Sequence, residues 1–270
     1  MLSVQVREKS PLVHCMTNFV TVNDVANILL SIGASPTMAD SACEVAEIAT
    51  MADALYINMG TIDEHIVDAM ICAGQAANKA GTPVVLDPVG CGASHFRQES
   101  IQKVLSSVHF TAIRGNASEI KTIIEGTGSS RGVDVEEKDE VTEDSLPQIL
   151  KKLQTLSQKL DCVIAVSGAI DLVVYKDQQA ILRNGDSMMK SITGAGCMLT
   201  AVIAAFCAFG QDAFFPTISA ISCMNIAGER AKELLLDTEG NASFRTHLID
   251  SIGKIDTKLL NKKVKYELIR

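Results

Sequence analysis

Residues 84 to 92 read Val84-Val85-Leu86-Asp87-Pro88-Val89-Gly90-Cys91-Gly92. The apolar run predicts a β-strand, and the glycines after Asp87 predict a turn that follows the strand directly. Four other short apolar runs predict strands, at Ala54–Asn58, 111–114, 162–167 and 172–175. Longer segments of helical period alternate with these runs, which is typical of crossover units in a mainly parallel sheet. We therefore expect an α/β fold.

Short polar motifs predict where helices begin and end. Ser41-Ala42-Cys43-Glu44 and Thr61-Ile62-Asp63-Glu64 both match the capping box, in which a hydroxyl and a carboxylate satisfy the free amides at a helix start. A third helix is predicted to begin after Thr21, a possible N-cap, and to end at Gly33. The apolar face of this helix consists of Val25, Ile28, Leu29 and Ile32.

The middle of the chain has a different character. From 126 to 144, Gly, Ser and acidic residues replace the apolar period, which predicts a surface loop or the edge of a lid. Residues 146–160 return to a helical pattern, and further helices are expected from Met198, Thr217 and Ser243.

The composition limits the class of protein. The chain has 270 residues, 47% of them apolar, and a formal net charge of −8. This length allows one large domain or two small ones, and because composition shows no boundary we expect a single domain over residues 1–270. The acidic balance, without a basic cluster beyond the short C-terminal tail, argues against nucleic acid as a partner.

The sequence also argues against a membrane or secreted protein. The most apolar run, residues 198–209, holds about a dozen residues, whereas a membrane span needs about 20, so we expect a core helix there. The N-terminus lacks the apolar core of a signal peptide. The eight cysteines show no C-x-x-C spacing, which favours free thiols. We expect a soluble, cytoplasmic protein with no membrane partner.

Two glycine-rich turns are candidate phosphate sites, because backbone amides at a helix start point outward at the positive end of the helix dipole. One follows Asp87, and the other is Thr193-Gly194-Ala195-Gly196-Cys197, which opens an apolar helix. In the second turn the dipole would lower the pKa of the Cys197 thiol, and the amides could stabilise a transferred phosphoryl group. A tight turn with an inert, packed cysteine is the alternative.

Five ordered segments carry a more specific signal. They are Pro11-Leu12-Val13-His14-Cys15-Met16-Thr17-Asn18, Gly33-Ala34-Ser35-Pro36-Thr37-Met38, Val85-Leu86-Asp87-Pro88-Val89-Gly90, Arg114-Gly115-Asn116-Ala117-Ser118-Glu119 and Thr193-Gly194-Ala195-Gly196-Cys197-Met198-Leu199-Thr200. Together they resemble the hydroxyethylthiazole kinase family, and they span about 190 residues.

The resemblance implies a fold, a reaction and an assembly. The family belongs to the ribokinase-like superfamily, so a three-layer α/β/α fold with a mainly parallel central sheet is expected. The implied reaction transfers the γ-phosphoryl of ATP to the primary alcohol of 4-methyl-5-(2-hydroxyethyl)thiazole, a thiamine salvage step. The family also implies dependence on Mg²⁺ and a homotrimer with active sites between adjacent subunits.

The resemblance assigns roles to seven positions. It implies that Cys197 is catalytic, Arg114 and Ser167 contact ATP, Met38 and Gly194 contact the thiazole substrate, and Asp87 and Glu119 lie near magnesium. Hard carboxylate oxygens suit magnesium, and the forked guanidinium suits phosphate. From the residues alone, a helix cap explains Asp87 or Glu119 as well, an ion pair explains Arg114, and core packing explains Met38.

The sequence departs from the related kinases at three positions. Most ribokinase-like enzymes have, at the position of Cys197, the Asp that orients the attacking hydroxyl. Thiazole kinases usually have Cys there, as this chain does. Phosphoryl transfer depends mainly on positioning and electrostatics, so a weak base can suffice. Ser167 stands where the family usually has Thr, and Phe19 where Tyr is common.

Three alternative functions stay open. A ribokinase-like kinase could phosphorylate another small alcohol, such as a hydroxymethylpyrimidine. A cysteine hydrolase could use Cys197 as nucleophile and His14 as base, the pair that such enzymes require. A nucleotide-binding regulator could keep the fold without turnover.

Overall fold

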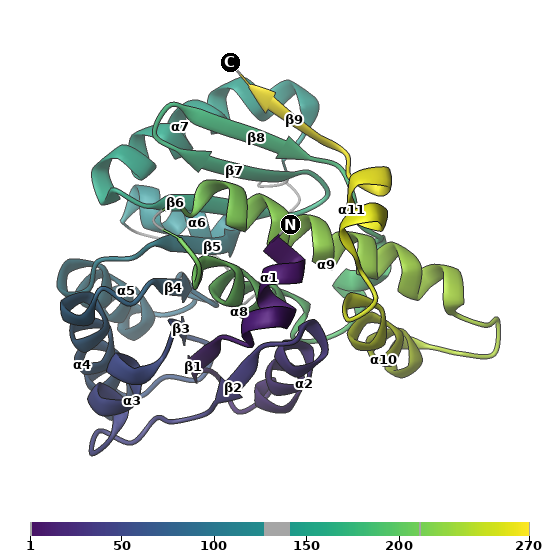
Figure 1. The fold of residues 1–270 in the computed structure, drawn as a ribbon. Coiled ribbons are helices and arrows are strands. Elements are labelled where there is room, and N and C mark those ends of the chain that lie inside the picture. The colour runs from purple at the N-terminus through teal and green to yellow at the C-terminus, as the bar shows by residue number, and fades with distance from the viewer. Residues whose placement is uncertain (1, 127–140, 211, 270) are drawn as a thin grey trace.

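The computed structural model describes residues 2–126, 141–210 and 212–269. Among these residues, nine strands form one sheet in the order β2-β1-β3-β4-β5-β6-β7-β8-β9. The first six are mutually parallel and the last three antiparallel. Their bounds are β1 Leu12–Met16, β2 Ser35–Thr37, β3 Ala54–Asn58, β4 Val84–Asp87, β5 Ala112–Asn116, β6 Val163–Ser167, β7 Asp171–Tyr175, β8 Gln178–Leu182 and β9 Tyr266–Ile269 (Figure 1).

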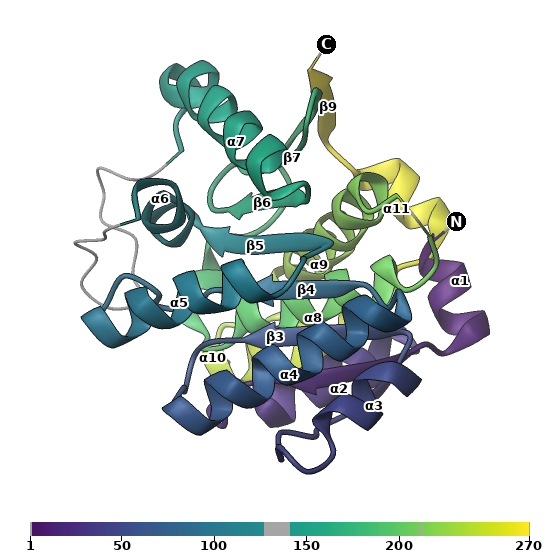
Figure 2. The ribbon, with the colours of Figure 1, turned by 90° about the vertical axis from the view of Figure 1, so that its left-hand side faces the viewer.

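Helices cover both faces of the sheet, which makes three layers (Figures 1 and 2). One layer contains α1 Leu2–Lys9, α2 Val22–Ile32, α8 Ala195–Cys207, α9 Phe214–Leu234, α10 Asn241–Ile252 and α11 Thr257–Lys263. The other contains α3 Val45–Met51, α4 Glu64–Ala80, α5 His95–Ser107, α6 Ala117–Glu125 and α7 Leu146–Leu160. Two short 3₁₀ helices, η2 Glu143–Ser145 and η3 Ser187–Ser191, complete the described elements.

The side-chain alternation of the strands explains the two hydrophobic cores. In β3, Ala54 and Tyr56 pack on the side of α8, whereas Leu55 and Ile57 pack on the side of α4. Because both faces are covered, β3 and β4 consist entirely of buried residues. The predicted three-layer fold with a mainly parallel sheet is confirmed.

Helix α8 is apolar around its whole circumference and is buried throughout. All of its residues from Cys197 to Cys207 are buried, against the sheet on one side and α2 and α9 on the others. This explains the apolar run that the sequence predicts to be a core helix. No helix of the described residues is long and apolar enough to cross a membrane.

The predicted helix boundaries are partly confirmed. Gly33 ends α2 in the left-handed conformation with φ 95°, as expected, whereas Thr21 occupies the N-cap position without a side-chain bond. The Thr61 capping box is wrong, because the Asp63 side chain accepts the Ile66 amide and α4 starts at Glu64. The Ser41 box is also wrong, since α3 starts only at Val45.

The expected surface loop from 126 to 144 lies mostly outside the described residues, which omit 127–140. At its near end, Gly126 terminates α6 in the left-handed conformation, with φ 70°. At its far end, η2 leads directly into α7, whose predicted bounds are confirmed.

Candidate active site

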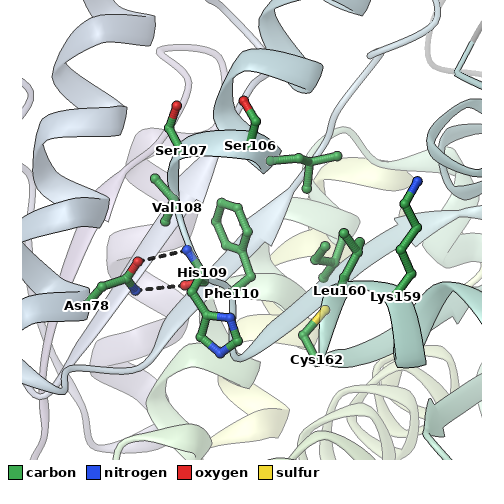
Figure 3. Close-up of a pocket in the computed structure, with 11 residues that line it drawn as sticks. Asn78, Ser106, Ser107, Val108, His109, Phe110, Lys159, Leu160 and Cys162 are labelled. Atoms are coloured by element: carbon green, nitrogen blue, oxygen red, sulfur yellow. Dashed lines mark hydrogen bonds between the residues drawn. The ribbon is translucent and has the colours of Figure 1, made fainter.

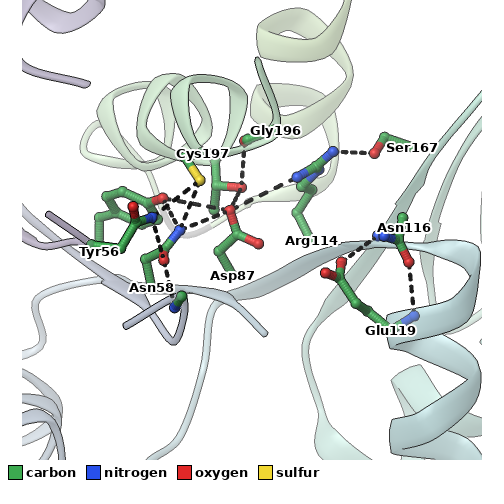
Figure 4. Close-up of polar contacts among 12 residues, drawn as sticks. Tyr56, Asn58, Asp87, Arg114, Asn116, Glu119, Ser167, Gly196 and Cys197 are labelled. Carbon is green, nitrogen blue, oxygen red and sulfur yellow. Dashed lines mark hydrogen bonds and ion pairs between the residues drawn. The ribbon is translucent and has the colours of Figure 1, made fainter. Parts of the chain in front are cut away.

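Four polar residues end neighbouring parallel strands at one edge of the sheet. Asn58 ends β3 beside Asp87, which ends β4, and Asn116 ends β5 beside Ser167, which ends β6. The carboxyl ends of parallel strands meet at one edge, where α/β proteins commonly bind ligands. The first turn of α8 reaches the same edge and brings Cys197 to the side chain of Asn58 (Figure 4).

The carboxylate of Asp87 is the centre of this network and is fully buried. Its Oδ2 accepts hydrogen bonds from Thr200 Oγ1 at 2.9 Å, Asn58 Nδ2 at 3.2 Å and the Tyr56 hydroxyl at 3.4 Å. Arg114 Nη1 lies 3.8 Å from the same oxygen. Burial raises the pKa of Asp87, and the charge of Arg114 opposes that shift. The second oxygen, Oδ1, is buried without a hydrogen-bond partner.

The thiol of Cys197 faces two side-chain amides. Its Sγ lies 3.4 Å from Asn18 Nδ2 and 3.3 Å from Asn58 Nδ2. Burial, followed by the negative charge of Asp87, raises the pKa of this thiol, while the two amides act in the opposite direction. The expectation that the helix dipole lowers this pKa is therefore wrong, because desolvation outweighs it. Cys197 is a neutral thiol at pH 7.

Arg114 connects Asp87 to Ser167. Its Nη2 donates a hydrogen bond to the Ser167 hydroxyl, while Nη1 faces Asp87. The guanidinium lies directly against Gly196 of α8, where a side-chain carbon would collide with Nη1. Gly196 thus lets a buried cation sit at the start of α8, and Nε of Arg114 has no hydrogen-bond partner.

Glu119 joins two loops through its carboxylate. Oε1 accepts the Gly90 amide at 3.0 Å and Oε2 accepts the Asn116 amide at 2.8 Å. The Asn116 side chain accepts the Glu119 amide in return, which completes a capping box at the start of α6. Burial and the charge of Asp87 raise the pKa of Glu119 to about 7. The helix-cap role weighed from the sequence is therefore confirmed.

Gly194 and Met38 make no described side-chain hydrogen bond to this network. Gly194 is the N-cap of α8 with φ 83°, and a side-chain carbon there would lie 2.8 Å from Thr21 Cγ2, so both backbone and space favour glycine. Met38 follows β2 at the carboxyl edge, and 38% of it is exposed. Among the described contacts, none links Met38 to Cys197 or Asp87.

Four network residues have no role in the sequence-based assignment: Asn18, Tyr56, Asn58 and Thr200. Asn58 Nδ2 lies 2.7 Å from the Tyr56 hydroxyl, and Asn58 Oδ1 accepts from Asn18 Nδ2 at 2.9 Å. One signal was available, because Asn58 ends a buried strand in the same way that Asp87 does. Thr200 also lies within the fifth quoted segment.

The proposed hydrolase pair is not assembled. The ring of His14 lies on β1 with Nε2 2.8 Å from the carbonyl oxygen of Ala39, whereas the Cys197 thiol faces Asn18 and Asn58. Burial lowers the pKa of His14 and keeps the ring neutral. The residue therefore anchors the chain just after Met38 and does not activate the thiol.

A cavity of about 410 Å³ lies at the opposite, amino edge of the sheet (Figure 3). It is lined by the ends of α5 and α7 and by residues that precede β5 and β6, including Phe110 and Cys162. Among its polar lining side chains, Asn78 is paired with the backbone of His109 and Ser106 with the carbonyl oxygen of Lys103. This cavity therefore lacks the convergent reactive groups of the carboxyl edge.

The residues at the carboxyl edge fit a magnesium ion that phosphate and water help to hold. In the described part of the chain, no group of three or more His, Cys, Asp or Glu side chains could hold a metal alone. Asp87 Oδ1 is an oxygen without a hydrogen-bond partner, which is the donor type that magnesium prefers. Glu119 already uses both oxygens for backbone amides and fits an indirect contact.

Two solved structures show which proteins this chain resembles. A solved structure of a hydroxyethylthiazole kinase from Pyrococcus horikoshii OT3 is similar with a TM-score of 0.88 and 32% identity, over 100% of this chain and 98% of that one. A ribokinase-like superfamily protein from Enterococcus faecalis shares the fold, with a TM-score of 0.63 and 12% identity over 90% of this chain and 86% of that one.

Sequence relatives agree as well. A hydroxyethylthiazole kinase from Clostridium acetobutylicum is 43% identical over 97% of this chain and 96% of its own length. One from Methanobrevibacter smithii is 43% identical over 98% of this chain and 94% of its own length. The model of the hydroxyethylthiazole kinase family matches residues 4–258. The chain therefore belongs to the hydroxyethylthiazole kinase family.

Proposed function

We propose that this protein transfers the γ-phosphoryl group of ATP to the primary alcohol of 4-methyl-5-(2-hydroxyethyl)thiazole, in thiamine salvage. The observation that carries the proposal is the buried network in which Asp87, Asn58 and Cys197 meet at the first turn of α8. Arg114 adds a cation beside it. A neutral thiol, a carboxylate, an arginine and a helix N-terminus together suit a phosphoryl group that moves between two oxygens.

The start of α8 supplies hydrogen-bond donors for the transferred group. Met198 makes the first amide bond of the helix, to the Gly194 carbonyl at 2.8 Å, so the amides of Ala195, Gly196 and Cys197 precede the helical ladder. These donors lie at the positive end of the helix dipole. Arg114 and Ser167 lie beside them, and we assign both to the ATP phosphates.

Cys197 orients the acceptor hydroxyl in this proposal. Its raised pKa keeps the thiol protonated, so it acts as a neutral hydrogen-bonding group and not as a strong base. A weak base is enough for a loose transition state, in which the nucleophile loses its proton late. We assign Met38 and Gly194 to the thiazole side, where a thioether can pack against an aromatic ring.

Asp87 and Glu119 would hold Mg²⁺, in part through water, and the ion would neutralise charge on the phosphates. The unpartnered Oδ1 of Asp87 supports this assignment. Glu119 contributes mainly by keeping the Gly90 turn and the end of β5 together.

The deciding experiment measures ADP formation by the purified protein with Mg·ATP and each of three additions: hydroxyethylthiazole, hydroxymethylpyrimidine, or no acceptor. We expect ADP that depends on the thiazole and a product heavier by one phosphate. ADP formation that depends on the pyrimidine would instead identify hydroxymethylpyrimidine as the substrate. The absence of turnover in folded protein that binds nucleotide would favour the regulator.

We also propose that the chain acts as a single domain in a cytoplasmic homotrimer with sites between subunits. All described strands belong to one sheet, which supports the single domain. Phe19 and Val20 are 79% and 58% exposed directly after Asn18, so apolar surface adjoins the site. The eight free cysteines suit a reducing compartment. Light scattering on the eluting protein tests the trimer, and a monomeric mass would contradict it.

A further inference from the structure

Asp171 is a buried carboxylate that the proposed mechanism does not use. It begins β7 and is 4% exposed. Its Oδ1 accepts the Gly168 amide at 2.9 Å, and its Oδ2 accepts Asn225 Nδ2 at 2.5 Å. A buried carboxylate is costly to desolvate, and the two hydrogen-bond donors offset part of that cost. The carboxylate in turn fixes the positions of the two groups that donate to it.

The first of these bonds acts on a turn at the carboxyl edge. Residues 168–170 connect β6 to β7, and Gly168 and Ala169 are exposed. Ser167, directly before the turn, pairs with Asn116 in the sheet and accepts a hydrogen bond from Arg114. The Asp171 carboxylate therefore fixes the backbone one residue after the Ser167 hydroxyl.

The second bond ties this turn to the helix layer. Asn225 lies inside α9 and is 5% exposed, among residues that are otherwise mostly apolar. Its amide nitrogen is directed at the Asp171 carboxylate, and this hydrogen bond joins α9 to the first residue of β7.

We propose that Asp171 and Asn225 are positioning residues of the nucleotide site, which hold the 168–170 turn so that the Ser167 hydroxyl and the turn backbone face the ATP phosphates with Arg114. The proposal rests on the proposed function for the placement of ATP, and it adds the device that orders this side of the site. Neither residue touches the nucleotide in this proposal, and both act through the turn.

The ionisation of Asp171 offers a readout beyond stability. Burial raises the pKa of Asp171 to about 6, while the Gly168 amide, the Asn225 amide and the charge of Arg114 oppose the shift. The neighbouring strand residue across from Asp171 in β8 is the apolar Leu182. The carboxylate is therefore ionised above about pH 6, where it is the stronger acceptor for both amides, and protonated below it.

The test compares four variants of the whole protein by calorimetric binding of a non-hydrolysable ATP analogue with Mg²⁺, by steady-state kinetics and by thermal unfolding. Asp171→Ala removes both acceptors, Asn225→Ala removes one donor, and Asp171→Asn keeps the shape. Asp177→Ala is the matched control, because Asp177 lies at the other end of the β7–β8 hairpin, exposed, and accepts only from Gln154 at 2.8 Å among the described contacts.

We expect Asp171→Ala to weaken nucleotide binding about tenfold and Asn225→Ala about threefold, with an unchanged KM for the thiazole. Asp171→Asn should bind within about twofold of the parent at pH 8, because its amide oxygen can accept from Gly168 and its amide nitrogen can donate to a flipped Asn225. Below about pH 6 the protonated Asp171 matches Asn in shape and in its donors and acceptors, so the ratio of the affinities of the parent and Asp171→Asn should move toward one. Protonation of the nucleotide itself affects both proteins alike, so its effect cancels in the ratio of their affinities.

The outcomes separate the two proposals. Unchanged nucleotide affinity in Asp171→Ala and Asn225→Ala overturns the positioning role, as does an equal loss in Asp177→Ala. If Asp171→Ala fails to fold, Asn225→Ala and the pH ratio decide in the same way. Parent protein that binds nucleotide but phosphorylates no alcohol contradicts the proposed function and leaves the positioning role standing.

Discussion

The two edges of the sheet are built from the same strands but are chemically opposite. At the carboxyl edge, β3 and β4 end in Asn58 and Asp87, and a buried oxygen of Asp87 lacks a partner. At the amino edge a pocket of about 410 Å³ is present, and its lining side chain Asn78 is fully paired, as the two 2.8 Å bonds to the His109 backbone show. Buried polar atoms without a partner also occur in α9 and α10, so it is the meeting of Asp87 with Arg114 and Asn58, and not the presence of a hollow, that distinguishes the carboxyl edge.

Among substitutions that test this contrast between the two edges, Asp87→Asn should have the largest effect on activity. The amide oxygen can still accept from Thr200, Asn58 and Tyr56, so the fold should persist, but the buried Arg114 cation loses its carboxylate partner, which should lower the melting temperature. We expect kcat to fall about 10³-fold, because charge stabilisation at the phosphates is lost. Steady-state kinetics and thermal unfolding measure both quantities. A kcat within tenfold of the parent would remove Asp87 from the reaction.

Replacement of Cys197 tests a second residue at the carboxyl edge. Cys197→Ala removes the group beside Asn18 and Asn58 and should lower kcat about 10²-fold, whereas Cys197→Asp should keep substantial activity. Initial rates with saturating ATP and thiazole compare the two. Equal rates for Cys197→Ala and the parent would exclude the thiol from the mechanism.

Arg114→Ala tests the nucleotide side. Loss of its contacts with Ser167 and Asp87 should raise the KM for ATP about tenfold or more and affect the KM for the thiazole less. Titration of each substrate at a saturating level of the other separates the effects. A larger change in the thiazole KM would assign Arg114 to the acceptor instead.

The smallest effect on activity is expected at the amino edge. Asn78→Ala removes two hydrogen bonds to the His109 backbone and should lower the free energy of unfolding by roughly 1–2 kcal/mol. Urea denaturation measures this loss. The values of kcat and both KM should stay unchanged, and a marked fall in either substrate's kcat/KM would show that the two edges are coupled.

The sequence pattern predicts most of the central sheet but misses its flanks. Strands β3 to β7 are apolar runs, so period and composition are enough to find them. The β1 strand contains the buried His14, and β9 is an exposed edge strand with Glu267 in its middle, so neither resembles a core strand. At α4, Asp63 and Thr61 are both capping residue types, and only the tertiary path of the chain selects Asp63.

Motifs predict the reactive residues of the site better than their partners. Asp87, Arg114 and Cys197 come from ordered segments and do meet in space. Asn58 lies 139 residues from Cys197 along the chain, and no local sequence pattern predicts that the two side chains are in contact. The raised pKa of the thiol is likewise a consequence of burial by the whole fold. The roles assigned to all seven positions, Met38 and Gly194 included, stay predictions.

The amide of Asn58 has fewer hydrogens than neighbours that can accept them. Its nitrogen carries two hydrogens, yet three acceptors surround it: the Tyr56 hydroxyl at 2.7 Å, Asp87 Oδ2 at 3.2 Å and Cys197 Sγ at 3.3 Å. One of the three therefore goes without an Asn58 hydrogen at any instant. Other donors cover that acceptor, because Thr200 and Tyr56 donate to Asp87 Oδ2 and Asn18 faces Cys197 Sγ. The hydrogens of Asn58 can therefore be redistributed between the carboxylate and the thiol without moving a single heavy atom.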